Sequence, residues 1–170
     1  MRVPVFLLML VATAWSGSAQ EPADNPYRTP LEPVGFEAHA VVAPPVAPPG
    51  EEILKTTRLA VEIRVELADY LPRGLEPVLV IGGEPVETPT RIVSVEDGVT
   101  TLGFLVDEAA LLREGASLAV QMGDEESTRA ALPATLRLRD IAPLDAEAAR
   151  ELGLPDLRTW LDQADEEKPE

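Results

Sequence analysis

The sequence contains no cysteine, and only 4% of its 170 residues are aromatic. Without cysteine there is no disulfide bond, so core packing alone must stabilise a folded domain, even in an oxidising compartment. Because aromatic residues are scarce, that core must consist of valine, leucine, isoleucine and alanine. Zinc, copper and iron sites normally use cysteine and histidine, and the single histidine, His39, lies in a proline-rich segment. The sequence therefore argues against these metals and against Cys-His or Ser-His catalysis.

Positive charge is also scarce. The chain has 14 lysine and arginine residues against 30 aspartate and glutamate residues, which gives a formal net charge of -16. Phosphate backbones are bound by clustered lysine and arginine, so nucleic acid is excluded as a partner. Carboxylates are the abundant reactive groups, and a carboxylate-based hydrolase would need two of them flanking a cleft. Such clefts are usually lined with aromatic residues, so a hydrolase is the last of three functional alternatives.

The N-terminus has the pattern of a secretory signal peptide. Met1-Arg2 is followed by an apolar run over residues 3–15 and by the small residues Gly17-Ser18-Ala19. This order predicts cleavage after Ala19. The apolar run is shorter than the roughly 20 residues that span a bilayer, although a retained anchor is the alternative. We therefore expect a periplasmic or secreted protein with no stable membrane insertion after signal removal.

Proline marks the next segment. Eight prolines lie between Glu21 and Gly50, and proline has no amide hydrogen to donate to a sheet. Residues 20–57 are therefore predicted to be a disordered, extended linker with polyproline character. The complete predicted organisation is a signal peptide (1–19), this linker (20–57), a β-sandwich domain (58–140) and an acidic helical tail (141–170).

Residues 58–67 form the clearest strand in the sequence. Aliphatic side chains at every second position alternate with mostly charged ones, the period of a strand with one face on a core. Further strands are predicted over residues 78–81, 91–95, 100–106, 117–122 and 132–139. Turns are predicted at Gly82-Gly83 and, as a hairpin, at Asp97-Gly98. The pattern predicts an all-β fold, an immunoglobulin-like β-sandwich of six to seven strands; a small open barrel is the alternative.

A helical turn predicted over residues 109–112 resembles the crossover between the two sheets of immunoglobulin-like sandwiches. The tail is predicted to contain two short helices, over residues 143–153 and 156–164. In the second helix, Leu157, Trp160 and Leu161 fall on one face at helical spacing. This face is either an anchor for a partner or a cover for one open end of the sandwich.

The function expected from these patterns is a non-catalytic, exported binding or structural module. Seventeen prolines and many alanines are typical of a GC-rich bacterial genome, so we expect an accessory subunit or interaction domain whose partner is another envelope protein. The predicted contact residues are Leu157, Trp160 and Leu161, together with Val86 at a sheet edge. No cofactor is expected.

The first alternative is a calcium-dependent adhesion-type sandwich. Its metal ligands would be Asp97, Asp124 and Glu125, because calcium prefers hard oxygen ligands in loops. The D-x-D-x-D spacing of a dedicated calcium loop is missing, and turn chemistry alone also explains these acids.

Overall fold

The computed structural model describes residues 30–43, 57–70 and 76–166. The predicted signal peptide and parts of the predicted linker lie outside these residues. The strands are β1 (Pro33–Ala43), β2 (Arg58–Ala68), β3 (Pro77–Ile81), β4 (Glu84–Val86), β5 (Thr90–Glu96), β6 (Val99–Val106), β7 (Leu118–Met122) and β8 (Glu125–Ala131). The helices are the 3-10 helices η2 (Ala109–Leu111) and η3 (Leu138–Asp140), then α1 (Ala146–Glu151) and α2 (Leu157–Glu166).

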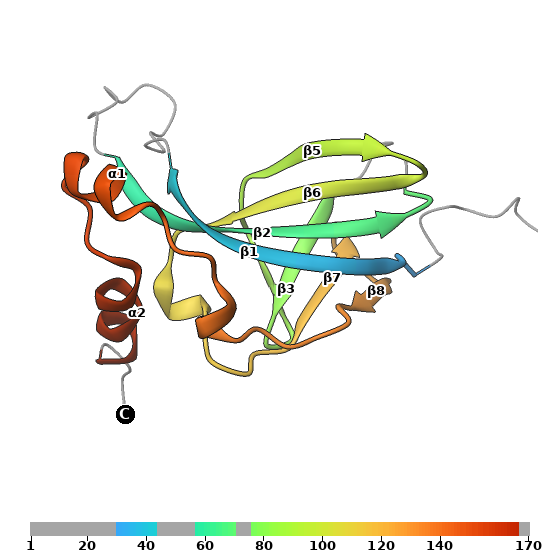
Figure 1. Ribbon diagram of the computed structural model, residues 1–170. Helices are drawn as coiled ribbons and strands as arrows, with labels where there is room; N and C mark the ends of the chain where they lie inside the picture. The colour runs from blue at the N-terminus through green and yellow to red at the C-terminus, as the bar shows by residue number, and fades with distance from the viewer. Residues whose placement is uncertain (1–29, 44–56, 71–75, 167–170) are drawn as a thin grey trace, which may run out of the picture.

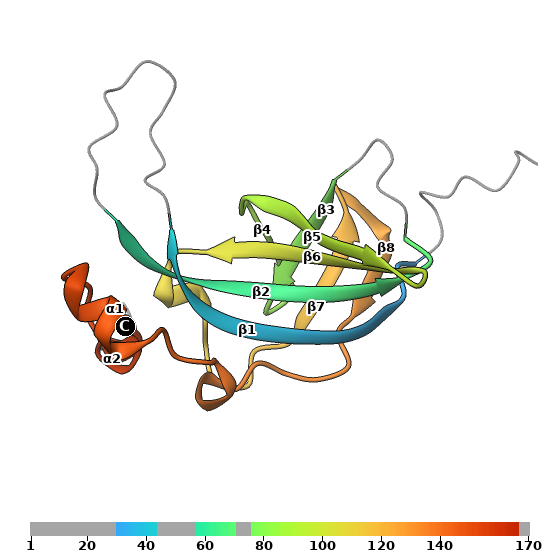
Figure 2. The ribbon, with the colours of Figure 1, turned by 45° about the horizontal axis from the view of Figure 1, so that its top comes forward.

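The eight strands form two antiparallel sheets of four. One has the order β1-β2-β6-β5 and the other β4-β3-β7-β8. The two sheets lie as separate layers, with β1, β2, β6 and β5 side by side in one of them (Figure 2). The fold is therefore all-β and sandwich-like, as the sequence predicts.

The inner face of β2 supplies the centre of the core. Leu59 and Leu67 at its ends, and the three aliphatic residues between them on the same face, are all buried. Ile63 lies opposite Phe104 of β6 in the antiparallel register, and Phe104 is the largest fully buried side chain. A single phenylalanine surrounded by branched aliphatic residues makes this core, which agrees with the low aromatic content.

The linker prediction is wrong over residues 33–43, because these residues form β1. The strand pairs with β2 from Pro33 to Ala43, so the sheet begins well before residue 58. Pro33 is at the first position of the strand, where a missing amide donor is tolerated. The rest of β1 has no proline, and Ala38 and Ala40 are buried in the core. The prolines on both sides of β1 led to the prediction of a linker in place of this strand.

The last predicted strand, over residues 132–139, is also wrong. The structure places the final strand, β8, earlier, and residues 132–137 form no regular element before η3. Leu132 and Leu136 are buried, but they are four residues apart, and Ala134 between them is exposed. The segment contacts the core at these two leucines only, and its side chains do not alternate between buried and exposed positions. β8 itself is mostly polar and gave no period-2 signal.

The turn predictions are confirmed. Gly82 and Gly83 have positive φ angles of 63° and 96°, and the Asp97-Gly98 turn has φ angles of 50° and 78°. Both turns join neighbouring antiparallel strands, β3 to β4 and β5 to β6. Glycine adopts such angles without steric cost and aspartate tolerates them better than most residues.

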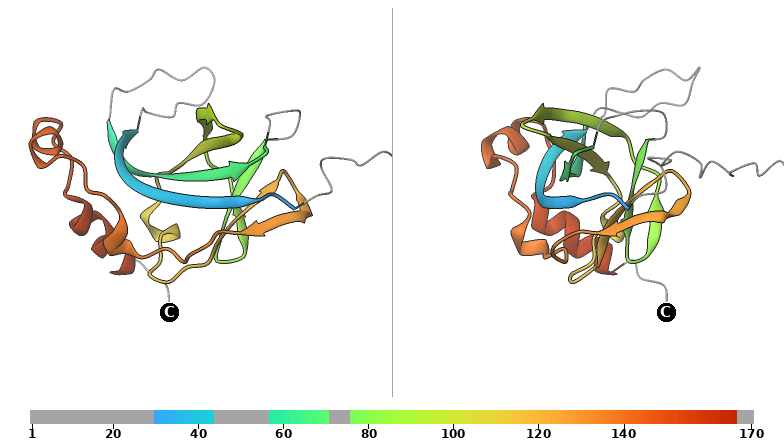
Figure 3. Two further views of the ribbon diagram at one scale, coloured as in Figure 1. Left: turned by 45° about the vertical axis from the view of Figure 1, so that its right-hand side comes forward. Right: turned by 90° about the vertical axis from the view of Figure 1, so that its right-hand side faces the viewer.

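Both predicted tail helices are present. The carboxylate of Asp145 accepts hydrogen bonds from the amides of Glu147 and Ala148 at the start of α1, which is a regular helix cap. In α2, Leu161 is buried, while Leu157 and Trp160 are half-buried and pack against the core. The two helices lie at one end of the sheets (Figure 3). None of the helices among the described residues is both long and apolar enough to cross a membrane.

Replacing Leu161 with alanine tests how the tail is attached. Loss of this buried side chain should lower the free energy of unfolding by about 2 kcal/mol and move the fluorescence of Trp160 to longer wavelength, because α2 loosens. Leu152→Ala is the matched control, since Leu152 lies in the same tail and is 44% exposed. Equal effects of the two substitutions in urea titrations would show that α2 does not depend on the core.

Candidate functional site

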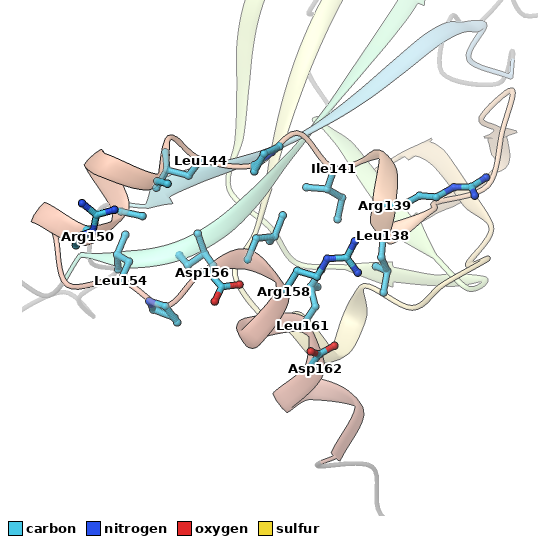
Figure 4. Close-up of a pocket in the computed structure, with 16 residues that line it drawn as sticks. Leu138, Arg139, Ile141, Leu144, Arg150, Leu154, Asp156, Arg158, Leu161 and Asp162 are labelled. Atoms are coloured by element: carbon cyan, nitrogen blue, oxygen red, sulfur yellow. The ribbon is translucent and has the colours of Figure 1, made fainter.

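One hollow of the described structure is a groove between the helical tail and the sandwich. Its volume is about 610 Å³, and its walls come from one end of β2, from the segment around η3 and from α1 and α2. Apolar side chains make most of the lining, including Leu59, Ile141, Leu144, Leu154 and Leu161. Figure 4 shows Ile141, Leu144, Leu154 and Leu161 around the groove. A mostly apolar hollow of this size with a few charged groups is typical of a small-molecule site.

The charged residues of the groove are Arg139, Arg150, Arg158, Asp156 and Asp162. Arg139 lies 3.7 Å from Asp140, whereas no ion pair within 4 Å involves Arg150 or Arg158 among the described residues. Two arginines without an ion-pair partner thus border an apolar hollow in a strongly acidic protein.

The carboxylate of Asp156 caps the start of α2. It accepts hydrogen bonds from the hydroxyl and from the amide of Thr159. These two bonds, and to a smaller extent the amide and the charge of Arg158, lower the pKa of the Asp156 carboxyl from its ordinary value. Its charge is therefore directed at the helix terminus and at Arg158, and it does not compensate Arg150.

A second feature is the apolar side of β5. Of the five exposed large hydrophobic residues in the described structure, three lie on this strand: Ile92 at 53%, Val93 at 37% and Val95 at 52%. Ile92 and Val95 lie opposite Leu102 and Thr100 of β6, which point into the core. The inner side of β5 therefore extends beyond the part of the sandwich that the second sheet covers.

The backbone edge of β5 is open as well. Within the described residues, β5 pairs only with β6. The other edge of the same sheet, β1, is bridged at one place, because Ala142 exchanges backbone hydrogen bonds with Ala38 and Ala40. In the second sheet, the carbonyl of Thr128 on β8 accepts a hydrogen bond from the amide of Leu31, and β4 has only three residues. β5 is thus an edge strand of seven residues that combines an open edge with three exposed aliphatic side chains, and another strand can pair with it.

The third feature is a buried carboxylate on the outer face of β2. Glu62 is only 3% exposed, and its carboxylate accepts hydrogen bonds from Nε of Arg64 at 2.8 Å and Nε of Arg91 at 2.6 Å. Gly103 on β6 leaves the space for it, since a Cβ atom there would lie 2.6 Å from Oε1 of Glu62. The hydrogen bond between Glu62 and Arg91 thereby links β2 to β5, across the intervening strand β6.

The protonation of Glu62 follows from these contacts. Burial by itself would raise the pKa of the Glu62 carboxyl, but the hydrogen bonds and charges of Arg64 and Arg91 outweigh it, so this pKa lies below its ordinary value. The carboxylate is therefore ionised at neutral pH and fully engaged, which is the state of a structural group and not of a general acid or base.

The residues predicted from the sequence are found at separate places. Leu157, Trp160 and Leu161 lie on α2, and Val86 on β4 is partly buried against the core. Asp97 lies in the β5–β6 turn, whereas Asp124 and Glu125 lie at the β7–β8 turn. No group of three or more potential metal ligands occurs within residues 30–43, 57–70 and 76–166.

Two features were missed by the sequence analysis. The groove combines residues from four segments, and nothing in the spacing of its arginines marks them. The residues of β5 have the sequence pattern of an ordinary half-buried strand. This pattern does not show which part of one sheet is covered by the other sheet, so the exposure of β5 could not be predicted.

Comparisons of the chain with protein-family models, with curated protein sequences and with solved structures gave no match. The function is therefore argued from the geometry of the chain alone.

Glu62→Gln should destabilise the protein by about 2 kcal/mol at pH 7, because two arginines lose their carboxylate partner. The pKa of Glu62 is depressed in the folded state, so the contribution is complete above the ordinary value of 4.5 and is lost as the pH falls through the lower folded-state value. The difference between the two proteins in urea titrations should shrink on acidification. Glu66→Gln, an exposed position on the same face of the strand, is the control; a difference for Glu62→Gln that is independent of pH would contradict this account.

Proposed function

We propose that this chain is a non-catalytic, exported interaction module, an immunoglobulin-like β-sandwich that binds an extended segment of another envelope protein along β5. The observation that carries the proposal is the concentration of exposed aliphatic side chains on β5, an edge strand that pairs only with β6 within the described residues. An open edge supplies backbone groups for strand addition, and its exposed side chains supply specificity.

The state of the buried polar groups supports a non-catalytic role. The buried polar side chains are Glu62, Thr100, Gln121 and Thr128. Each has a structural partner: Gln121, for example, donates to the carbonyl of Gly123 and accepts from Arg129. Thr128 accepts from the amide of Met122 and donates to the carbonyl of Glu125. Such groups hold turns and strands in place, which is a structural role.

The form of β5 restricts what can bind to it. A bulge at Val93 interrupts the register with β6, and Arg91 and Glu96 place opposite charges near the two ends of the strand. Bulges and charges at an edge limit indiscriminate pairing. The partner segment is therefore a short strand whose apolar residues meet Ile92 and Val95. Since the whole chain carries a net charge of -16, a partner with flanking basic residues fits better than an acidic one.

The α2 face makes a weaker contact surface. Leu161 is buried and Trp160 packs partly against the core, so most of the apolar surface that an anchor would offer is already used within the chain. This favours the β5 edge over the tail as the place of contact.

Val95→Lys tests the proposal, because a charge on the exposed side of β5 should abolish capture of the partner without affecting the core. The measurement is a pull-down from the native envelope fraction, in which the unchanged protein retains a stoichiometric partner. Val34→Lys is the matched control: Val34 is 49% exposed, against 52% for Val95, and lies on the opposite edge strand of the same sheet.

Loss of the partner with Val95→Lys and retention with Val34→Lys would support strand addition at β5. Equal retention by both variants would place the contact elsewhere and refute the proposal. Circular dichroism and melting temperature of both variants show that neither result comes from unfolding.

A further inference from the structure

We propose that the groove between the tail and the sandwich binds a small amphipathic anion, an unbranched alkyl chain that ends in a carboxylate. This inference concerns a different surface from β5 and does not depend on the proposed function. Three observations carry it: the apolar lining, the positions of Arg150 and Arg158 at the hollow without an ion pair within 4 Å in the described structure, and the engagement of the amides of Ala149, Leu154 and Trp160 within the tail.

The lining fits a hydrocarbon chain. The floor is made by buried aliphatic residues of the core, Leu59, Ile141 and Leu161. Leu144, Leu154 and Leu157, which are half-buried, continue this surface toward the opening. The hollow of about 610 Å³ is within the range of pockets that enclose small ligands, and removing an alkyl chain from water onto such a surface is favourable.

The charge at the groove selects the head group. Arg150 and Arg158 come from different helices and both border the hollow (Figure 4). The acidic residues of the same lining are Asp156, which is engaged by Thr159 and interacts with the charge of Arg158, and Asp162, which lies next to Leu161 on α2. Arg150 on α1 is therefore the arginine that neither of these acids engages. Guanidinium groups pair with carboxylates through charge-assisted hydrogen bonds. The arginines therefore favour an anionic head group even though the molecule as a whole is acidic.

The backbone of the helical wall argues for a hydrocarbon chain in preference to a peptide. The amides of Ala149, Leu154 and Trp160 already donate to backbone carbonyls within the tail, at distances of 2.9 to 3.1 Å. A peptide inserted beside these helices would bury amide and carbonyl groups without partners, which is costly. An alkyl chain has no such groups.

The test is isothermal titration of the purified protein with decanoate, decan-1-ol and decyltrimethylammonium, which share the chain and differ in the charge of the head group. Decanoate should bind saturably at one site and more tightly than the alcohol, and the ammonium compound should bind least. Equal binding of all three compounds, or no saturable binding of decanoate, would overturn the proposal.

Two double variants distinguish the effect of the groove arginines on decanoate binding from the effect of net charge. In R150Q/R158Q, decanoate should bind about tenfold more weakly, because charge-assisted hydrogen bonds to the head group are lost, while binding of decan-1-ol should not change. R113Q/R137Q is the matched control: it removes the same charge from two arginines outside the groove that also lack an ion-pair partner in the described structure. If decanoate binding weakened equally in both double variants, the effect would come from the change in net charge alone. The assignment of Arg150 and Arg158 to the head group would then be refuted.

A third variant fills the groove. Ala149 lies on α1 and lines the hollow, so Ala149→Trp should abolish binding of both decanoate and decan-1-ol while the melting temperature is kept. Unchanged decanoate binding in this variant would place the ligand elsewhere and overturn the inference. Val95→Lys should bind decanoate normally, which separates this site from the edge of β5.

Discussion

The structure depends on the burial of β2 on both of its faces. Toward the second sheet, its aliphatic residues meet Phe104 and the other core side chains. On the outer face, Glu62 is covered by Arg64 and Arg91. In a chain without disulfide bonds, this central strand holds the flanking strands together: β1 and β6 pair with it directly, and Arg91 links β5 to it. The buried charge of Glu62 is paired with Arg64 of the same strand and with Arg91 of β5. Its burial costs desolvation energy, which the two arginines must offset.

The two candidate surfaces result from the same geometry. The strands of the sheet that contains β2 are longer than most strands of the sheet that covers it, so parts of its inner face are left uncovered by that sheet. At one end, the tail helices lie beside the sheet (Figure 1), and the groove lies between them and the sandwich. Along the edge strand β5, Ile92 and Val95 remain exposed in the described structure. An incomplete sandwich thus provides one partly enclosed apolar surface and one open one.

Local patterns in the sequence predicted the local structure well. The alternation in β2, the Asp97-Gly98 hairpin and both tail helices could all be predicted from neighbouring residues. β1 could not be predicted in this way, since it is flanked by prolines and its place depends on pairing with β2. β8 could not be read either, because its stability comes from Thr128 and from the pairing with β7. The groove and the exposure of β5 depend on contacts between distant segments, which no local pattern encodes.

The hydrogen bonds between Ala142 and β1 have a consequence for how the chain can be divided. Residue 142 adds a parallel bridge at His39, so the segment leading to the tail acts as a short extra strand on the first strand of the sheet. A fragment that ends at Asp140 would keep all eight strands but would lose the backbone hydrogen bonds of Ala38 and Ala40 with Ala142. The edge of β1 would then be free at these residues, in addition to the edge of β5. The segment that leads into the tail thus belongs to the same folding unit as the sheet.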